Sequence, residues 1–278
     1  MHPMTAELEL RQAACALLVL DDPAGKAAGT RELAATPVYV DAGRVLQEPV
    51  GVPGRPARPP LVSPRDVPGR GVASVEARAA LLHALAHIEF NAINLALDAV
   101  WRFAGMPDEY YLDWLKVAGE EALHFSLLAD HLRILGHAYG DFPAHDGLWQ
   151  MAERTRLDPL ARMALVPRTL EARGLDVSPA IRAKLAGAGD EAAAGILDII
   201  LRDEIGHVAI GNRWYRYLCE REGVDPVDHY AVLARRHDAP GQFGPFNLPA
   251  RRAAGFTEAE LRSLEQSAIS GRDRPRSA

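Results

Sequence analysis

Two Glu-x-x-His sequences, each set in an apolar segment, carry the clearest potential for chemistry in this chain. They run from Glu121 to His124 and from Glu204 to His207. Residues three apart on an α-helix share a face and are about 4.5 Å apart along the axis, so a glutamate and a histidine in this relation can bind one ion together. A carboxylate on the apolar face of a helix needs a proton, a cation or a metal as its partner. The two pairs therefore predict metal ligands on two helices.

Two further glutamates repeat the pattern. Glu89 precedes Glu121 by 32 residues, and Glu171 precedes Glu204 by 33 residues. Each of these glutamates lies on an apolar stripe with helical spacing, so each is predicted to point into a helical core. Two divalent ions would neutralise the four carboxylates. The predicted metal ligands are Glu89, Glu121, His124, Glu171, Glu204 and His207.

Long amphipathic segments must position these side chains. Ser74 is a good N-cap for a first helix, and Gly105 with Pro107 marks its end. No alternating pattern typical of strands stands out in this region, so the fold class is predicted to be all-α. Pro159 is near one possible start of the third helix, Pro167 is expected to kink this helix and Gly174 to end it, and a short connecting helix is expected to follow. The four long helices are predicted at about 74–104, 108–135, 151–173 and 190–222.

The remaining residues predict extensions on both sides of a four-helix bundle. A helix near the N-terminus is followed by eight prolines between Thr36 and Pro68, which exclude a continuous helix there. Such an arm is often a linker, but its Val, Leu and Tyr also suit a segment packed on the bundle. The predicted divisions are 1–73 for the N-terminal helix and packed arm, 74–222 for the bundle and 223–278 for a C-terminal extension.

Composition restricts the classes of protein and partner. The 278 residues are 48% hydrophobic and carry a formal net charge of −6, which fits a globular protein and disfavours a dominant nucleic-acid or anionic-membrane surface. No apolar run approaches the roughly 18 residues of a membrane span, and the first residues lack the basic start of a signal peptide. Cys15 and Cys219 form no metal or disulfide motif. We expect a cytoplasmic protein that is a monomer or a small homo-oligomer.

The six predicted ligands resemble those of the ferritin-like di-iron or di-manganese carboxylate proteins, whose bundle supplies Glu from two helices and Glu-x-x-His from the other two. Several stretches are similar, more narrowly, to a bacterial ferritin-like family catalogued as domain of unknown function 455. The resemblance implies a ferritin-like bundle of two hairpins joined by a long crossover, but no substrate. It also implies that Asp203 supports His124 and that Glu120 supports His207. The similar stretches are HIEFNAINLALD, EEALHF, YGDFPAHDGLW, EARGLD, DEIGHVAIGNRWY and FNLPARRAAGF.

A pair of transition metals held by carboxylates and imidazoles can exchange two electrons with O₂ or peroxide. We therefore expect two Fe ions, with Mn or a mixed Mn/Fe pair as alternatives, in an oxidoreductase that oxidises or hydroxylates a small organic substrate. An electron-donor protein is an expected partner, and a nucleic-acid substrate is a minority alternative. A ferroxidase, an iron-handling or peroxide-detoxifying protein, and a non-catalytic interaction protein with a structural metal pair are the other candidate functions.

Overall fold

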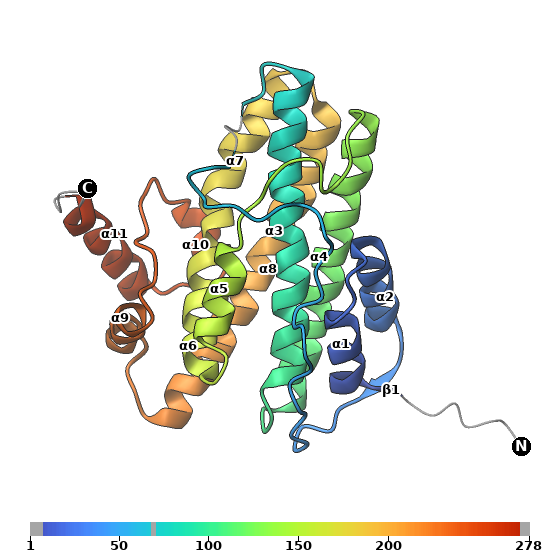
Figure 1. Cartoon of the computed structure of the whole chain (residues 1–278). Helices are drawn as coiled ribbons and strands as arrows, with labels where there is room; N and C mark the ends of the chain where they lie inside the picture. The colour runs from blue at the N-terminus through green and yellow to red at the C-terminus, as the bar shows by residue number, and fades with distance from the viewer. Residues whose placement is uncertain (1–7, 68–70, 273–278) are drawn as a thin grey trace, which may run out of the picture. The chain divides into compact units, whose positions relative to one another are not determined.

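The computed structural model describes residues 8–67 and 71–272, and this part of the chain is all-α, as predicted. Its short strands, β1 (Leu8–Glu9) and β2 (Val38–Tyr39), pair in parallel. The chain divides into two compact units, one within residues 1–149 and one within 150–278. Each unit is built around a pair of neighbouring helices (Figure 1).

The first unit is built on α3 (Val75–Arg102) and α4 (Asp108–Ile134), which lie side by side in Figure 1. The side chain of Ser74 caps α3 by accepting a hydrogen bond from the backbone N–H of Ala77. A short turn then reverses the chain into α4. Both helices therefore confirm the predictions for 74–104 and 108–135 to within two residues. α1 (Leu10–Leu18) packs on α3, and α2 (Pro23–Ala35) packs on α4.

The helix α2 was not predicted, because its sequence has little amphipathic pattern. Its start nevertheless carries a recognisable signal: Asp22 caps the backbone N–H of Gly25, and Pro23 occupies the first turn. Residues 1–7, part of the predicted N-terminal helix, lie outside the described residues.

The Pro-rich arm lies along the helices of the first unit. The guanidinium of Arg11, on α1, donates hydrogen bonds to the carbonyls of Asp41 and Arg44 in the arm and to the carbonyl of Trp101 on α3. The ammonium of Lys26 donates to the arm carbonyl of Gly54 at 2.9 Å and to Asn94 Oδ1 on α3 at 2.6 Å. Buried cations thus satisfy backbone carbonyls of a segment that lacks regular structure.

The second unit contains a series of helices that differs from the single helix predicted at 151–173. The end of α5 (Gly147–Arg154) is followed by a break, after which Asp158 caps α6 (Pro159–Leu165). A π-helix (Val166–Glu171) continues α6 and leads into α7 (Ala172–Gly187). The prediction of one continuous helix from 151 was therefore wrong, whereas the possible start at Pro159 is confirmed. The capping signal of Asp158 and Pro159 outweighs the periodicity across it.

Gly174 does not end a helix, and this prediction was also wrong. α7 continues through Gly174 and includes the segment that was predicted as a separate connecting helix. A glycine is tolerated inside a helix where the neighbouring helix packs closely, at a cost of about 1 kcal/mol relative to alanine. Here a Cβ on Gly174 would be 3.5 Å from Glu204 Oε1 on the neighbouring α8.

The fourth long helix, α8 (Glu191–Glu222), confirms the prediction for 190–222. Asp190 caps its start, and Gly223 ends it in the left-handed conformation. The C-terminal extension forms further helices, α9 (Pro226–Arg236), α10 (Leu248–Ala253) and α11 (Glu258–Arg272). In Figure 1, α7 and α8 run side by side, and α10 also contacts both of them.

The helix α3 is long and apolar enough to cross a membrane by length and composition, with a mean hydropathy of 1.3 over its best window. The sequence-based expectation concerned uninterrupted apolar runs, and Glu89 and Asp98 do interrupt this helix, whereas an average over a window tolerates isolated charged residues. Since 83% of that window is buried inside the structure, α3 has the surroundings of a core helix.

Candidate metal centre

Three predicted ligands come together in the first unit. The Nδ1 atom of His124 is 3.3 Å from Oε2 of Glu89 and 3.3 Å from Oε2 of Glu121. One potential ligand atom from each of the three residues lies within 4.8 Å of the other two. All three side chains are buried. A Glu-Glu-His set is therefore formed by α3 and α4 alone.

The apolar stripes of α3 and α4 explain this position. Glu89 lies between the buried Leu82 and Ile93 on α3, while Glu121 and His124 lie between the buried Trp114 and Leu128 on α4. Side chains at these spacings share one face of each helix. Burying the two apolar faces against each other therefore also buries the polar residues in their middle.

The electrostatics of this set favour retained protons or a bound cation. Burial and the nearby charge of Glu121 hold the pKa of Glu89 well above its usual range. Burial alone would lower the pKa of His124, but hydrogen bonds to Glu121 and Glu89 and their charges raise this pKa to about 11. Without a metal, protons on His124 and on the Glu89 carboxyl therefore limit the net negative charge buried here. A divalent cation can replace such protons, and metal binding would release them.

The second unit carries the other Glu-x-x-His pair. Glu204 Oε2 is 3.1 Å from Nδ1 of His207, and both side chains are buried on α8. Glu171 is also buried and is the last residue of the π-helix. Gly174 lies three residues after Glu171, on the same face, and its Cα faces Glu204. This packing directs the Glu171 face of the segment towards α8.

The two predicted supporting acids have partners on their own helices. Glu120 Oε1 is 3.6 Å from the Lys116 ammonium, and Asp203 Oδ1 is 2.7 Å from Nε of Arg202. The predicted support of His124 by Asp203 and of His207 by Glu120 stays a prediction.

Two histidines near Glu89 contact the loop that follows α4. His83 Nε2 accepts a hydrogen bond from the backbone N–H of Gly140, and His87 Nδ1 is 2.9 Å from the hydroxyl of Tyr139. Burial lowers the pKa of each histidine to about 4, so both are neutral. They anchor the loop after α4 rather than adding to the ligand set.

Sequence reasoning missed residues that surround the predicted ligands. The ring of Tyr139 packs against Phe90 and Phe125, which directly follow Glu89 and His124. Tyr139 lies in a loop, where no periodic pattern could have indicated this contact. The π-helix that ends at Glu171 was missed as well, although Pro167 signalled a disturbance of regular α-helix.

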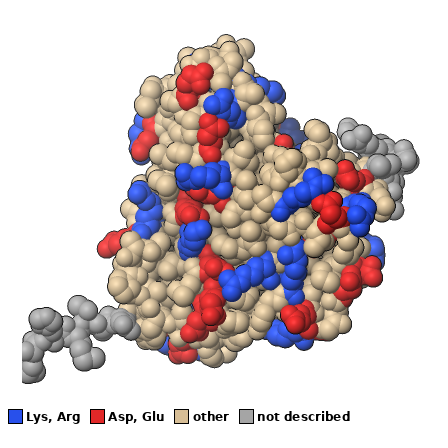
Figure 2. All heavy atoms as spheres, turned by 180° about the vertical axis from the view of Figure 1, so that it is seen from behind, with Lys and Arg blue, Asp and Glu red and all other residues tan. Residues whose placement is uncertain are grey.

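The surface carries charges of both signs. Figure 2 shows Lys and Arg side chains interspersed with Asp and Glu side chains over the displayed face. Together with the formal net charge of −6, this mixture is not typical of a surface dedicated to nucleic acid.

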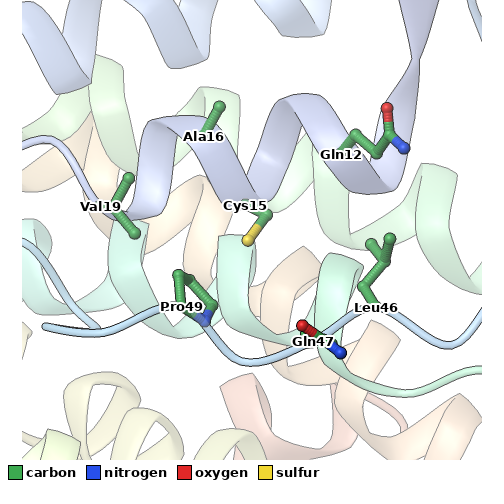
Figure 3. Close-up of a pocket in the computed structure, with 7 residues that line it drawn as sticks. All are labelled: Gln12, Cys15, Ala16, Val19, Leu46, Gln47 and Pro49. Carbon is green, nitrogen blue, oxygen red and sulfur yellow. The ribbon is translucent and has the colours of Figure 1, made fainter.

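A separate apolar groove of about 330 Å³ lies between α1 and the Pro-rich arm (Figure 3). Cys15 lies in this groove and is partly exposed, whereas Cys219 is buried on α8. Burial and the charge of Asp98 raise the pKa of the Cys15 thiol. The groove therefore presents a protonated thiol, not a metal ligand set. Its lining residues are Gln12, Cys15, Ala16, Val19, Leu46, Gln47 and Pro49.

Comparison with known proteins gives a family but no activity. The model of a family described as protein of unknown function (DUF455) matches residues 19–262. The chain belongs to this family. It is also similar to an uncharacterized protein of Haemophilus influenzae (strain Rd), with 53% identity over 213 residues that cover 74% of each chain. No solved structure matches the chain.

Proposed function

We propose that this DUF455 chain is a ferritin-like di-metal carboxylate protein in which each compact unit supplies two glutamates and one histidine. In this proposal, the pairs α3–α4 and α7–α8 are the two hairpins of a four-helix bundle. That both ligand sets serve one two-metal centre rests on the repeated sequence pattern alone. The proposed ligands are Glu89, Glu121 and His124 in the first unit and Glu171, Glu204 and His207 in the second.

The observation that carries the proposal is the geometry of Glu89, Glu121 and His124. Ligand atoms about 2.1 Å from one ion, at angles of roughly 90–110°, are about 3.0–3.4 Å apart. Both carboxylate oxygens are 3.3 Å from the histidine nitrogen, which is within that range. Mixed carboxylate and imidazole ligands suit Fe and Mn. The residues therefore fit a bound transition metal.

The proposed activity is the use of O₂ or peroxide to oxidise or hydroxylate a small organic substrate, in the cytoplasm and with an electron-donor protein. A bound metal pair would supply the two-electron chemistry. The chain's own residues would hold the metals, and buried apolar neighbours such as Leu82 and Leu128 would exclude water from them. Fe is the proposed metal, with Mn or a mixed pair as the alternatives.

Elemental analysis of the protein purified without added metal tests this proposal. We expect about two Fe or Mn ions per chain in the wild type, and loss of metal in Glu121→Gln, His124→Ala, Glu204→Ala and His207→Ala. Glu109→Gln is the matched control, because Glu109 is exposed in the first turn of the same α4. Wild-type protein that stays metal-free after anaerobic addition of Fe(II) would refute the proposal.

The same preparation separates the proposed activity from the alternatives. Oxidation of many equivalents of Fe(II) by O₂, or consumption of peroxide without an organic substrate, would favour iron handling or detoxification. Metal that neither O₂ nor peroxide oxidises would favour a structural role.

A further inference from the structure

The π-helix (Val166–Glu171) carries an arginine that ties it to two other elements of the second unit. Arg168 is 3% exposed, and its Nε donates to Asn212 Oδ1 on α8 at 2.5 Å. Its Nη2 donates to Glu260 Oε1 on α11 at 2.6 Å. The guanidinium also lies over the rings of Tyr215 and Phe256, at 4.2 and 5.1 Å from their centroids. Arg168 therefore connects the π-helix to α8 and to the C-terminal extension.

A second buried ion pair connects the extension to the other side of Glu171. Asp176, in the first turns of α7, accepts two hydrogen bonds from Arg251 on α10, at 3.0 and 2.7 Å. The backbone N–H of Asn247 also donates to Asp176, and the Asn247 side chain donates to the carbonyl of Leu175. The C-terminal extension is thus attached three residues before Glu171 and five residues after it.

Burying these charged groups costs free energy, because they lose their hydration. Replacing a buried ion pair by apolar residues is often neutral or stabilising, so the pairs are weak evidence for a contribution to stability. In addition, Nη1 of Arg168 and Nη1 of Arg251 are buried and find no hydrogen-bond partner among the described residues, which adds an unfavourable desolvation free energy. The pairs do fix the relative orientation of the segments that they join, because a guanidinium fork binds a carboxylate in a fixed geometry.

The backbone between the two ties has an unusual conformation. π-helices are rare, occur mostly as single turns and are frequent at functional sites. Pro167 lacks a backbone N–H, and its ring packs against Gly211 so closely that a Cβ on Gly211 would be 2.5 Å from Pro167 Cβ. The contacts of Arg168 and Asp176 lie on either side of Glu171, the last residue of this turn.

We propose that the C-terminal extension is a clamp that sets the position of Glu171, with Arg168 and Glu260 as its positioning residues. This inference rests on the proposed function, because it assigns Glu171 to a metal. The clamp joins the ligand-bearing turn to residues about 90 positions later in the chain. The extension therefore helps to form the metal site by holding Glu171 in place, and neither Arg168 nor Glu260 is itself a metal ligand.

Full-length Glu260→Gln and Arg168→Lys test the clamp, with Glu258→Gln as the matched control. Glu258 is on the same α11 and pairs with Arg252, but this pair is exposed and does not reach the π-helix. Titration of metal-depleted protein with Co²⁺, followed by visible absorption, measures the binding of each ion. We expect at least tenfold weaker binding of one ion in both variants, with the other ion and the control unchanged. If the variants and the wild type have equal thermal stability in the presence of a chelator, the weaker Co²⁺ binding does not result from a loss of folding.

Hydrogen exchange of residues 166–174 in metal-depleted protein provides a readout that needs no metal. Glu260→Gln should speed exchange there at least tenfold, whereas Glu258→Gln should not. Unchanged exchange in folded Glu260→Gln would overturn the clamp. Faster exchange with unchanged Co²⁺ binding would overturn its role in positioning Glu171. Wild-type protein that binds no ion would refute the proposed function, and the exchange result would then still decide whether the clamp exists.

Discussion

Two glycines of α8 are expected to respond in opposite ways to the same substitution. Gly195 is exposed, and a Cβ built on it meets no atom of the described residues within 4 Å, apart from its chain neighbours and the nearby backbone of its own helix. Gly211 is buried, and a Cβ there would lie 2.5 Å from Pro167 Cβ and 2.6 Å from Pro167 Cγ. Both glycines are interior residues of the same helix. Gly195→Ala and Gly211→Ala therefore differ mainly in this one packing contact.

The magnitudes follow from helix propensity and from overlap. Alanine in place of a helical glycine stabilises by about 1 kcal/mol, which should be the whole effect of Gly195→Ala. Carbon atoms normally pack at about 3.5–4.0 Å, so Gly211→Ala forces an overlap of about 1 Å against a rigid ring. Such overpacking costs about 1–3 kcal/mol. We therefore expect no gain, or a net loss of up to about 2 kcal/mol, for Gly211→Ala.

Urea unfolding of metal-depleted protein, followed by circular dichroism, measures both effects. Because Pro167 precedes Glu171 by four residues, Gly211→Ala should also weaken binding of one Co²⁺ ion, whereas Gly195→Ala should leave binding unchanged. If Gly211→Ala stabilised the protein as much as Gly195→Ala, this would refute the reasoning that α8 packs too closely on the π-helix at Gly211 to accept a methyl group.

Two further predictions concern titratable groups of the first unit. Burial lowers the pKa of Lys26 to about 7, so the folded protein binds fewer protons than the unfolded chain above that pH. The free energy of unfolding should therefore rise by about 2 kcal/mol between pH 7 and pH 9, and this rise should be absent in Lys26→Met. Equal pH dependence of urea unfolding in the wild type and in Lys26→Met would contradict the lowered pKa of Lys26. Because its pKa is raised, Cys15 should react with iodoacetamide at pH 7.4 more slowly than glutathione, and the buried Cys219 should react only on unfolding. Peptide mass spectrometry measures both rates, and faster reaction of Cys15 would refute the assigned environment.

The parts of the fold that the sequence predicted correctly depend on local interactions. The predicted cap at Ser74 and the turn before α4 involve neighbours within a few residues. The same holds for the Asp190 cap and the left-handed Gly223, which the structure shows at the predicted bounds of α8. The apolar stripes likewise depend only on helical spacing. For this reason, the three longest helices and the burial of the acids and histidines on them could be predicted from the residue order.

The errors lie where competing local signals are of similar strength. At Asp158, a capping signal opposed a continuous periodic pattern, and the cap prevailed. At Gly174, a residue that often ends helices stays helical because α8 packs close to it. The choice between such alternatives depends on a neighbouring helix that local sequence does not identify.

The candidate ligands on α3, α4 and α8 follow from the sequence because a helix repeats its faces every few residues, and burying an apolar face buries any acid within it. The distances among Glu89, Glu121 and His124 required the packing of α3 against α4. The π-helix that ends at Glu171 could not be read from local sequence, and its attachment through Arg168 to Glu260 required a contact across 92 residues. Such contacts depend on which surfaces meet after the chain folds, and residue order alone carries no periodic signal for them.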